Sequence, residues 1–600
     1  METNFEPVEG STGSRTIADL MAIAAVKHAD KVAVRHKVGD LWVDVTYAEV
    51  GLIVSEIGRG LIALGVQSGD RVAILCETRP EWTYADFGVT SAGAVVVPVY
   101  PTNSPQECEW VVGNSEAIAV ICEDARQVAK IVEVRERLPN LTMIIVVDPS
   151  GDVGDAIAMD EVRTKGRQLE LSELTARYSA ITPEDPFTFI YTSGTTGPPK
   201  GCVLTHGNYR SVISMSESLN VLSEGEDVYL FLPLAHAFAI LIQLLSFDLG
   251  SSIAYWTGDP QKIVAELIET KPTYFPSVPR IFEKLYTLAS KAILAKMSPD
   301  QFAEMVAMGV KVRDMQIRGE ELPGPLIAAF ASADEQVFAN VRALFGGNLR
   351  QAVTGAAPIS KEILEFFYAA GVPVLEGYGM TETATVATYS TIEHHRFGTV
   401  GRPLPGCEVK IASDGEILIK GANIFRGYYK NDDASFGAVI DGWLHTGDLG
   451  SVDGDGYVKI TGRKKDIIIT AGGKNLTPAN VENDLKQSRW ISQAVMHGDR
   501  RPYPVVLVTL DSDEITAWAT EQGLPLEIAT LAQEPRVRAM IQEALDSANQ
   551  KYANVEQVKK FAILDHDLTQ ETGELTPTLK VKRNVVNEKY AAIFDALYDE

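Results

Sequence analysis

Short apolar runs alternate with helix-forming stretches through the first two-thirds of the chain, and this alternation is the feature that most constrains its fold. Four of the runs are predicted to be buried strands, at residues 71–75, 94–99, 117–122 and 143–147. The sequence between them has the spacing of amphipathic helices. Strands that alternate with helices pair in mostly parallel sheets covered by helices. We therefore predict an α/β architecture.

Two later regions have a different pattern. Residues 296–345 are rich in helix formers, include a charged stretch at 311–321, and predict a helical excursion on the surface. From about residue 398 the sequence has short strands separated by glycine turns, at 408–411, 416–420 and 456–460. This pattern predicts a small β-rich unit over residues 398–462.

The stretch at residues 462–466 is the best candidate for a domain boundary. After it we predict a compact α+β unit, with helices at 478–487 and 535–552. The chain of 600 residues is long enough for about four units of roughly 150 residues. We expect an N-terminal domain over residues 1–462, a hinge at 463–466 and a smaller C-terminal domain over 467–600.

The charge balance restricts the partners of the chain. It has 54 Lys and Arg residues against 80 Asp and Glu residues, a formal net charge of −26. Nucleic-acid binding requires clustered positive charge, so we expect no nucleic-acid partner. A local pocket can still hold an anionic ligand against the overall field.

Cysteine usage and hydropathy favour a cytoplasmic protein. The five cysteines include no Cys-x-x-Cys pair, which indicates reduced thiols. The first ten residues lack an apolar signal segment, and the most apolar stretch, 237–247, is too short to span a bilayer. We expect at most a transient contact with a membrane surface, because the net negative charge disfavours electrostatic docking.

The strongest local signal is the segment YTSGTTGPPKG at residues 191–201. Its glycines free the backbone to surround an anion, its hydroxyls donate hydrogen bonds, and its lysine supplies a positive charge. It follows a strand-like run at 187–191 and precedes a helix-compatible stretch that starts near Asn208. The alternative is a flexible surface linker. The predicted phosphate-binding residues are Thr192, Ser193, Gly194, Thr195, Thr196, Gly197 and Lys200.

This loop is not a Walker A motif, because Pro199 stands where a glycine would precede the lysine. It resembles instead the phosphate-binding motif of adenylate-forming enzymes, the superfamily of acyl-CoA synthetases, luciferases and peptide-synthetase adenylation domains. The resemblance covers nearly the whole chain. Five further motifs match in order: Gly355, Ala356 and Ala357 in the adenine-pocket segment, YGMTE at 378–382, DGWLHTGD at 441–448, the hinge GRKKD at 462–466, and TPTLK at 576–580.

The resemblance implies a role for each matching residue in the N-terminal part. Tyr378 and Gly379 would contact adenine, to which the tyrosine offers a flat face. Thr381 would lie near the α-phosphate, and Glu382 would be a ligand of Mg²⁺. Asp448 and Arg463 would hydrogen-bond the ribose.

The resemblance also implies that the C-terminal domain is mobile. Lys580 would be the catalytic lysine, which reaches the α-phosphate when that domain is closed and stabilises the developing charge. The domain would then rotate about Lys465. Gly472 and Gly473 would face the channel for the pantetheine arm of coenzyme A, where the missing Cβ atoms allow close approach.

Other segments are similar to those of long-chain fatty acyl-CoA synthetases, namely residues 276–282, residues 471–475 and the excursion at 296–345. His236, in LPLAHAF at 232–238, would line the acyl pocket; the alternative is a satisfied buried histidine. The resemblance thus implies ATP- and Mg²⁺-dependent activation of a long-chain fatty acid through acyl-AMP to acyl-CoA, with coenzyme A as co-substrate. Homodimers occur among such enzymes.

Three alternatives stay open. A fatty acyl-AMP ligase would pass its acyl group to a carrier protein, and an inactive homologue would only bind lipid. The intact hinge and the Gly-Gly pair favour the synthetase over the acyl-AMP ligase. An inactive homologue is disfavoured because the chain keeps the candidate catalytic and binding residues Thr381, Glu382, Asp448 and Lys580. A peptide-synthetase adenylation domain is disfavoured because no carrier unit follows in this sequence.

Overall fold

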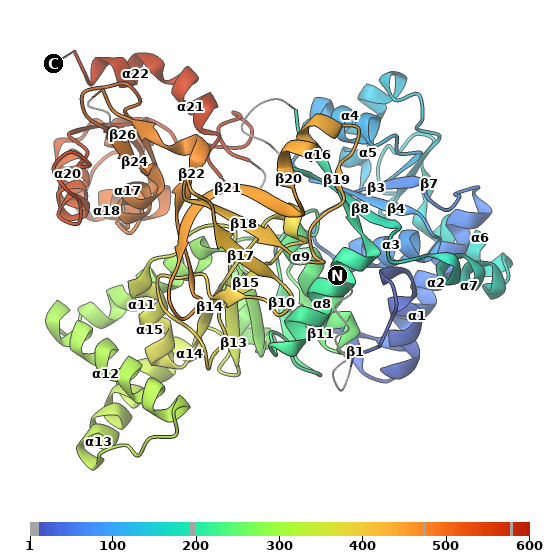
Figure 1. The fold of residues 1–600 in the computed structure, drawn as a ribbon, viewed down its shortest axis with the longest axis horizontal. Helices are drawn as coiled ribbons and strands as arrows, with labels where there is room; N and C mark the ends of the chain where they lie inside the picture. The colour runs from blue at the N-terminus through green and yellow to red at the C-terminus, as the bar shows by residue number, and fades with distance from the viewer. Residues whose placement is uncertain (1–10, 193–197, 472–473, 577–579, 600) are drawn as a thin grey trace.

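The computed structural model describes residues 11–192, 198–471, 474–576 and 580–599 (Figure 1). Two large sheets and a five-stranded antiparallel sheet carry most of the fold, and the C-terminal part has a three-stranded and a two-stranded sheet of its own. Helices cover the faces of the large sheets (Figure 1). The predicted α/β class is confirmed.

The first large sheet has eight strands in the order β19-β9-β8-β4-β3-β5-β6-β7. Strands β3 to β7 and the pair β4–β8 are parallel, whereas β9 pairs antiparallel with both β8 and β19. The four strands predicted from apolar runs all lie in this sheet, as β3, β4, β5 and β6. The bounds are β3 Arg71–Leu75, β4 Val95–Val99, β5 Ala119–Cys122, β6 Met143–Val146, β7 Ile157–Ala158, β8 Pro186–Thr192, β9 Lys200–Thr205 and β19 Gly427–Tyr428.

The second large sheet has nine strands in the order β16-β15-β14-β13-β12-β10-β11-β1-β2. Its central strands are parallel, and its two edges are antiparallel. The bounds are β1 Val32–Val38, β2 Leu41–Thr46, β10 Asp227–Leu230, β11 Ser252–Tyr255, β12 Tyr274–Ser277, β13 Gln351–Thr354, β14 Val374–Tyr378, β15 Thr388–Tyr389 and β16 Arg402–Pro403.

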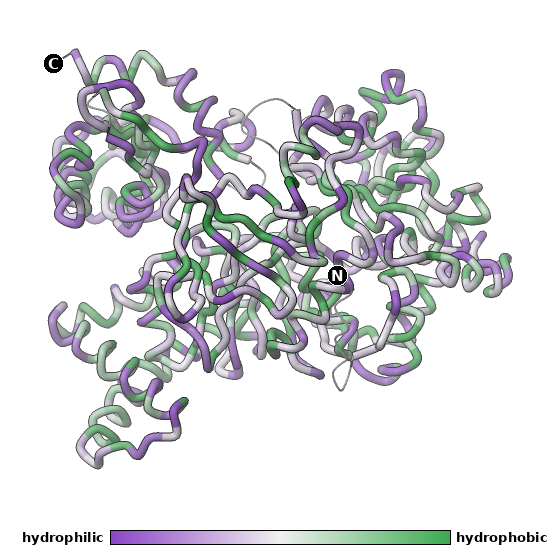
Figure 2. Tube along the Cα trace, viewed as in Figure 1, coloured by the Kyte–Doolittle hydropathy of each residue, from purple (hydrophilic) through white to green (hydrophobic). Residues whose placement is uncertain are grey.

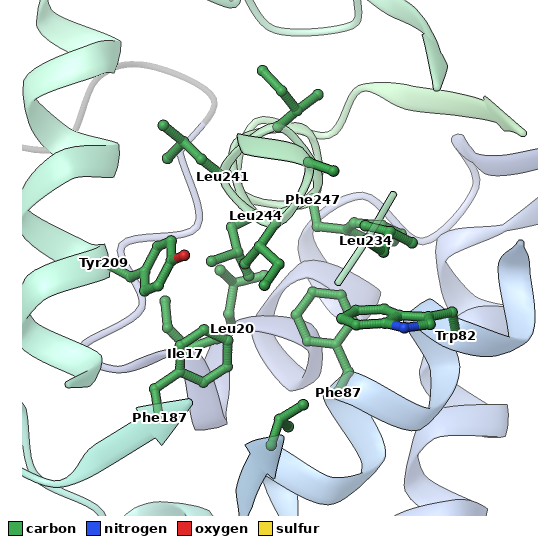
Figure 3. Packing of buried hydrophobic residues seen from close by; sticks show 14 of the residues in the cluster. Ile17, Leu20, Trp82, Phe87, Phe187, Tyr209, Leu234, Leu241, Leu244 and Phe247 are labelled. Atoms are coloured by element: carbon green, nitrogen blue, oxygen red, sulfur yellow. The ribbon is translucent and has the colours of Figure 1, made fainter. Parts of the chain in front are cut away.

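The largest core cluster includes residues of both sheets and the helices between them (Figure 3). Its centre is helix α9, which is apolar nearly all round, as expected of a fully buried helix. The rings of Phe87 and Phe247 meet edge to face with centroids 5.1 Å apart, and Trp82 is fully buried beside them. Each such aromatic side chain contributes about 2 kcal/mol by its burial.

Some helices of the N-terminal part begin with a side-chain cap; Thr46 and Glu49, for example, form a capping box at α2. Their bounds are α1 Ile17–Lys27, α2 Tyr47–Ala63, α3 Pro80–Ser91, α4 Pro105–Asn114, α5 Ala125–Val134, α6 Met159–Gln168, α7 Leu171–Ala180, α8 His206–Ser218, α9 Ala237–Asp248, α10 Ile263–Thr270, α11 Pro279–Leu294, α12 Pro299–Ile317, α13 Gly324–Ala333, α14 Ala339–Ala343, α15 Lys361–Ala370 and α16 Asp432–Ala438.

Residues 296–345, the segment expected to be helical, hold α12, α13 and α14. Helices α12 and α13 extend away from the sheets (Figure 1). The guanidinium of Arg313 in α12 lies 5.1 Å from the ring centroid of Phe330 in α13 and links the two helices. Among the described residues, no helix combines the length and the apolar character needed to cross a membrane.

The region expected to be β-rich does form a five-stranded sheet, with β17 Glu408–Ile411, β18 Glu416–Lys420, β20 Val439–Ile440, β21 Trp443–Val452 and β22 Val458–Arg463. It also supplies β16 and β19, which pair with the nine-stranded and the eight-stranded sheet. The region is therefore joined to both large sheets by backbone hydrogen bonds. One of these strands, β19, brings a side chain to the candidate site.

The C-terminal part has its own core. Its strands are β23 Ile468–Ile469, β24 Asn475–Leu476, β25 Ile491–His497, β26 Val505–Leu510 and β27 Lys560–Ile563, and its helices are α17 Pro478–Leu485, α18 Ser512–Gln522, α19 Ile528–Leu531, α20 Pro535–Asn549, α21 Arg583–Lys589 and α22 Ala591–Ala596. The two helices predicted here are α17 and α20. Many hydrophilic residues cover α18 and α20 on the outside (Figure 2).

Two ion pairs connect this part to helix α11. Arg280 lies 2.7 Å from Asp511, and Lys284 lies 3.8 Å from Asp513. All four side chains are partly exposed, so each pair contributes little to stability on its own. They are among the contacts that join the two parts in this structure, together with the packing of α17 on β22.

Candidate functional site

The predicted phosphate-binding loop connects two antiparallel strands. Thr192 at the end of β8 pairs with Lys200 at the start of β9. Ser193, Gly194, Thr195, Thr196 and Gly197 lie outside the described residues. Trp110 of α4 donates a hydrogen bond from its indole N–H to the carbonyl oxygen of Pro199, at 2.8 Å, and fixes the end of the loop.

The helix predicted to start near Asn208 is confirmed, and a strand that the sequence did not predict precedes it. Strand β9 comes first, because the apolar run after Gly201 pairs along β8. Helix α8 then begins at His206, where Thr205 and Asn208 form a capping box. The two strands that flank the loop, β8 and β9, are therefore antiparallel neighbours, and Lys200 lies on the second.

The YGMTE motif lies where β14 ends. Thr381 is buried in a short 3₁₀ turn, Thr381–Thr383. Gly379 has no room for a side chain, since a Cβ atom there would lie 2.2 Å from the carbonyl oxygen of Thr385. Thr385 itself has a φ of 99°, a strained conformation for a residue with a side chain. Its hydroxyl donates a hydrogen bond to the carbonyl oxygen of Ala237 at 2.7 Å. This bond connects the turn to the start of α9.

Glu382 projects from the same turn toward strand β19. The hydroxyl of Tyr428 donates a hydrogen bond to Glu382 Oε1 at 2.7 Å. No group of three or more His, Cys, Asp or Glu side chains forms a metal cage within the described part of the chain. Mg²⁺ commonly binds proteins through one or two carboxylates and completes its shell with phosphate and water oxygens, and Glu382 fits that mode.

Asp448 is the centre of a second cluster. Its Oδ2 accepts a hydrogen bond from the hydroxyl of Tyr378, and its Oδ1 accepts one from Nε of Arg463, both at 2.8 Å. Asp448 and Arg463 are paired residues of β21 and β22. Burial, and then the charge of Asp448, raise the pKa of Tyr378, so the phenol stays a donor. The structure thus brings together three residues that the sequence assigned to adenine and ribose.

The segment Gly355–Ala357 lies beside Tyr378 because β13 pairs with β14. A Cβ atom on Gly355 would lie 3.2 Å from the carbonyl oxygen of Gly377. Ala356 has a φ of 67°, in the left-handed region, and both alanines are exposed. An exposed, strained segment next to a tyrosine is a suitable wall for a flat ligand.

His236 is the N-cap of α9. Its Nδ1 accepts a hydrogen bond from the backbone N–H of Phe238 at 3.2 Å. Burial, and then the nearby charge of Lys580, lower the pKa of His236 to about 4. The imidazole is therefore neutral at physiological pH, with its proton on Nε2.

Lys580 comes from the C-terminal part and faces these residues. Leu575 and Val581 form an isolated bridge that closes its loop, and the backbone N–H of Thr576 donates to the carbonyl oxygen of Lys580 at 2.8 Å. The surrounding protein atoms, and then Arg463, lower the pKa of Lys580 to about 8, while Asp448 and Glu382 oppose that shift.

The expected hinge residue, Lys465, is exposed in the 3₁₀ turn Lys464–Asp466. Its neighbour Lys464 is anchored to the five-stranded sheet by Asp414 Oδ2 at 2.6 Å and Glu416 Oε2 at 2.9 Å. Gly472 and Gly473 lie outside the described residues.

Two residues at this site were missed by sequence reasoning. Tyr428 contacts both Glu382 and Lys200. Asn423 donates from its side-chain amide to the carbonyl oxygens of Thr383 and Val386, at 3.1 and 3.0 Å, and holds the 3₁₀ turn. Neither belongs to a motif with a chemical spacing, and only the pairing of β19 with β9 could have pointed to Tyr428.

Comparison with known proteins agrees with this geometry. The family model described as AMP-binding enzyme matches residues 21–429, and that of the AMP-binding enzyme C-terminal domain matches 465–600. The chain therefore belongs to the AMP-binding enzymes, as its motifs predicted.

Two relatives and one solved structure are similar along nearly the whole chain. The long-chain-fatty-acid–CoA ligase FadD15 of Mycobacterium bovis is 40% identical over 576 residues, which cover 95% of each chain. The long-chain-fatty-acid–CoA ligase ACSBG2 of Xenopus laevis is 33% identical over 624 residues, covering 98% of this chain and 84% of the relative. The O-succinylbenzoate coenzyme A synthetase of Bacillus subtilis, in complex with ATP and magnesium ion, shares the fold with a TM-score of 0.66 at 21% identity, covering 94% of this chain and 98% of that one.

Proposed function

We propose that this protein is a long-chain fatty acid–CoA ligase that uses ATP and Mg²⁺. The observation that carries the proposal is the 40% identity to a long-chain-fatty-acid–CoA ligase over 95% of both chains. The position of Lys580, close to Asp448, Glu382 and Arg463, supports it independently. A cation at this position would stabilise the negative charge that develops on the α-phosphate during adenylate formation.

In the first step a carboxylate oxygen of the fatty acid attacks the α-phosphorus of ATP. The bond to the bridging oxygen breaks, and acyl-AMP and pyrophosphate form. Lys580 stabilises negative charge that develops on the α-phosphate, and Thr381 donates its hydroxyl there. Lys200 and the loop at 192–197 hold the outer phosphates.

The nucleotide is oriented by the cluster around Asp448. One carboxylate can accept both ribose hydroxyls, because its oxygens offer about four lone-pair sites and two are used by Tyr378 and Arg463. Tyr378 and the segment Gly355–Ala357 enclose adenine. When bound at Glu382, Mg²⁺ neutralises charge on the phosphate oxygens.

In the second step the thiol of coenzyme A attacks the acyl carbonyl carbon, AMP leaves, and the thiol proton is released. We infer that the C-terminal domain, residues 467–600, rotates about Lys465 between the two steps. That rotation removes Lys580 and brings Gly472 and Gly473 toward the pantetheine arm. Neutral His236, at the start of α9, lines the acyl side of the site and donates from Nε2.

We also infer that the enzyme works in the cytoplasm and meets its lipid substrate by transient contact with membrane surfaces. Four of its five cysteines are buried thiols whose pKa is raised by burial, which suits a reducing compartment.

The test is release of pyrophosphate and AMP with Mg·ATP and straight-chain acids of 4 to 20 carbons, with and without coenzyme A. We expect turnover that requires coenzyme A and is fastest with acids of about 12 to 18 carbons, because a long apolar chain supplies more binding free energy. One pyrophosphate per enzyme, unaffected by coenzyme A, would indicate an acyl-AMP ligase instead. No pyrophosphate with any acid would reject the proposal in favour of a lipid-binding role.

A further inference from the structure

Tyr428 touches two charged residues that come from distant parts of the chain. Its hydroxyl donates to Glu382 Oε1 at 2.7 Å, and the ammonium of Lys200 lies 5.1 Å from the centroid of its ring. Glu382 is the candidate ligand of Mg²⁺, and Lys200 is the candidate contact of the outer phosphates. The Tyr428 side chain therefore contacts both the carboxylate that would bind the metal and the ammonium that would bind the phosphates.

Strand β19 is built to hold this tyrosine in place. Tyr428 pairs with Cys202 of β9, and the edge of the Phe425 ring packs against it with centroids 4.9 Å apart. Gly427 has a φ of 140°, which favours glycine, and a Cβ there would lie 3.0 Å from Oγ of Ser435. That same oxygen accepts the backbone N–H of Tyr428 at 2.8 Å. The position of the ring is therefore fixed by backbone pairing and by helix α16.

The phenol acts on Glu382 as a fixed donor. Tyr428 carries the proton of this hydrogen bond, because an ionised carboxylate only accepts. A neutral donor bound to one oxygen orients the carboxylate but does not neutralise it. The Cys202 thiol also contacts the Glu382 side chain, and the lone pairs that these two donors do not use can bind a cation.

Lys200 and Glu382 form no ion pair with each other among the described residues, although Lys200 contacts the ring of Tyr428 and Glu382 its hydroxyl. A direct ion pair would have satisfied both charges and left neither for a ligand. Instead the aromatic face stabilises the ammonium by a cation–π contact. The arrangement keeps a negative and a positive group side by side, ready for a cation and an anion respectively.

We propose that Tyr428 is the residue that positions Glu382 for the metal of the Mg·ATP complex, and that it also aligns Lys200 beside it. The inference rests on the proposed use of Mg·ATP and deepens it. Tyr428 itself touches neither the reacting carboxylate nor the α-phosphate in this scheme, so its effect falls on metal–nucleotide binding rather than on the chemical step.

The test compares Tyr428→Phe with the wild type, because phenylalanine keeps the ring and removes only the hydroxyl. The probe is the α,β-methylene analogue of ATP, in which the bond broken by adenylation cannot be cleaved, with Mn²⁺ or without metal, and its binding is measured by isothermal titration calorimetry without turnover. We expect binding of the metal–nucleotide complex to weaken about tenfold, the scale of a lost hydrogen bond to a charged group. Binding of the metal-free analogue in the presence of EDTA should change less than about twofold, since the cation–π contact to Lys200 remains.

Tyr429→Phe is the matched control. The Tyr429 hydroxyl donates to a different carboxylate, Glu116 Oε2, at 2.7 Å, and its ring packs on Phe189. This variant should bind both forms of the nucleotide as the wild type does. A steady-state assay adds a second readout: for Tyr428→Phe the Mg²⁺ concentration at half-maximal rate should rise about tenfold, with kcat at saturating Mg²⁺ nearly unchanged.

Two results would overturn the inference alone. One is unaltered binding of the Mn²⁺ complex by Tyr428→Phe; the other is an equal loss for the metal-free analogue, which would make Tyr428 merely structural. A wild-type protein that binds neither form of the nucleotide would instead overturn the proposed function, and this inference with it.

Discussion

At the scale of single residues, the candidate site is a set of charged and titratable groups from both parts of the chain, and these groups shift one another's pKa values. Lys580, from the C-terminal part, is repelled by Arg463 and attracted by Asp448 and Glu382. The same lysine helps to lower the pKa of His236. Its own pKa, about 8, lies close enough to neutrality to be measured in kinetics.

This pKa predicts a pH dependence of adenylation. Lysine is cationic below its pKa, so a lowered value means that the charged form is lost as the pH rises through about 8. Because the cation stabilises the transition state, kcat/KM for ATP in pyrophosphate release should fall above that pH. In Lys580→Arg the guanidinium stays charged, and the descending limb should disappear even if the rate is lower. The same limb in Lys580→Arg would assign it to another group.

Sequence reasoning predicted chemical roles for these residues but not their contacts. The motifs pointed to Tyr378, Asp448 and Arg463 as separate ligands of one nucleotide. That the tyrosine hydroxyl is bound to Asp448, 70 positions along the chain, depends on how the nine-stranded and five-stranded sheets meet. No local pattern encodes such a contact. Tyr428 was missed for the same reason, since its strand has only two residues.

At the scale of elements, helices and strands with strong periodicity were predicted well, and short strands were not. The run at 71–75 is strand β3 without any shift, and the helix expected from residue 535 is α20, which begins at that residue. Strands β16 and β19 have two residues each and no alternation to detect. They nonetheless join the β-rich region to both large sheets. The helix expected near Asn208 is α8, but strand β9 before it was missed, because β9 is buried along nearly its whole length and lacks the period-2 signal.

Because α11 contacts the start of α18, a crosslink between these helices should hold the C-terminal part in the orientation seen here. Lys284 and Asp513 lie 3.8 Å apart at exposed positions that cap no helix. A short bismaleimide linking the double variant Lys284→Cys, Asp513→Cys should preserve formation of acyl-AMP and abolish acyl-CoA formation, because Lys580 would stay at the nucleotide. Both single variants, treated in the same way, should make acyl-CoA normally. Full ligase activity of the linked protein, verified by mass, would refute rotation of the domain.

At the scale of the whole molecule, the fold class could be predicted from the sequence. Each strand or helix has its own local pattern, and the alternation of many such elements indicates an α/β fold. The net charge of −26 was informative about partners and not about architecture. What the sequence could not give is the relation of the two parts: Lys580 is 115 positions beyond Lys465. Its approach to Asp448 is a property of the assembled structure, and it is the basis of the proposed two-step reaction.

The most direct test of that reaction is a rapid-quench measurement of the two half-reactions in Lys580→Ala. If Lys580 acts only while the C-terminal part has the orientation seen here, formation of acyl-AMP from Mg·ATP and fatty acid should slow at least about tenfold. Formation of acyl-CoA from supplied acyl-AMP and coenzyme A should stay within about twofold of the wild type. Equal losses in both half-reactions would contradict the account, because the lysine would then serve a single fixed site.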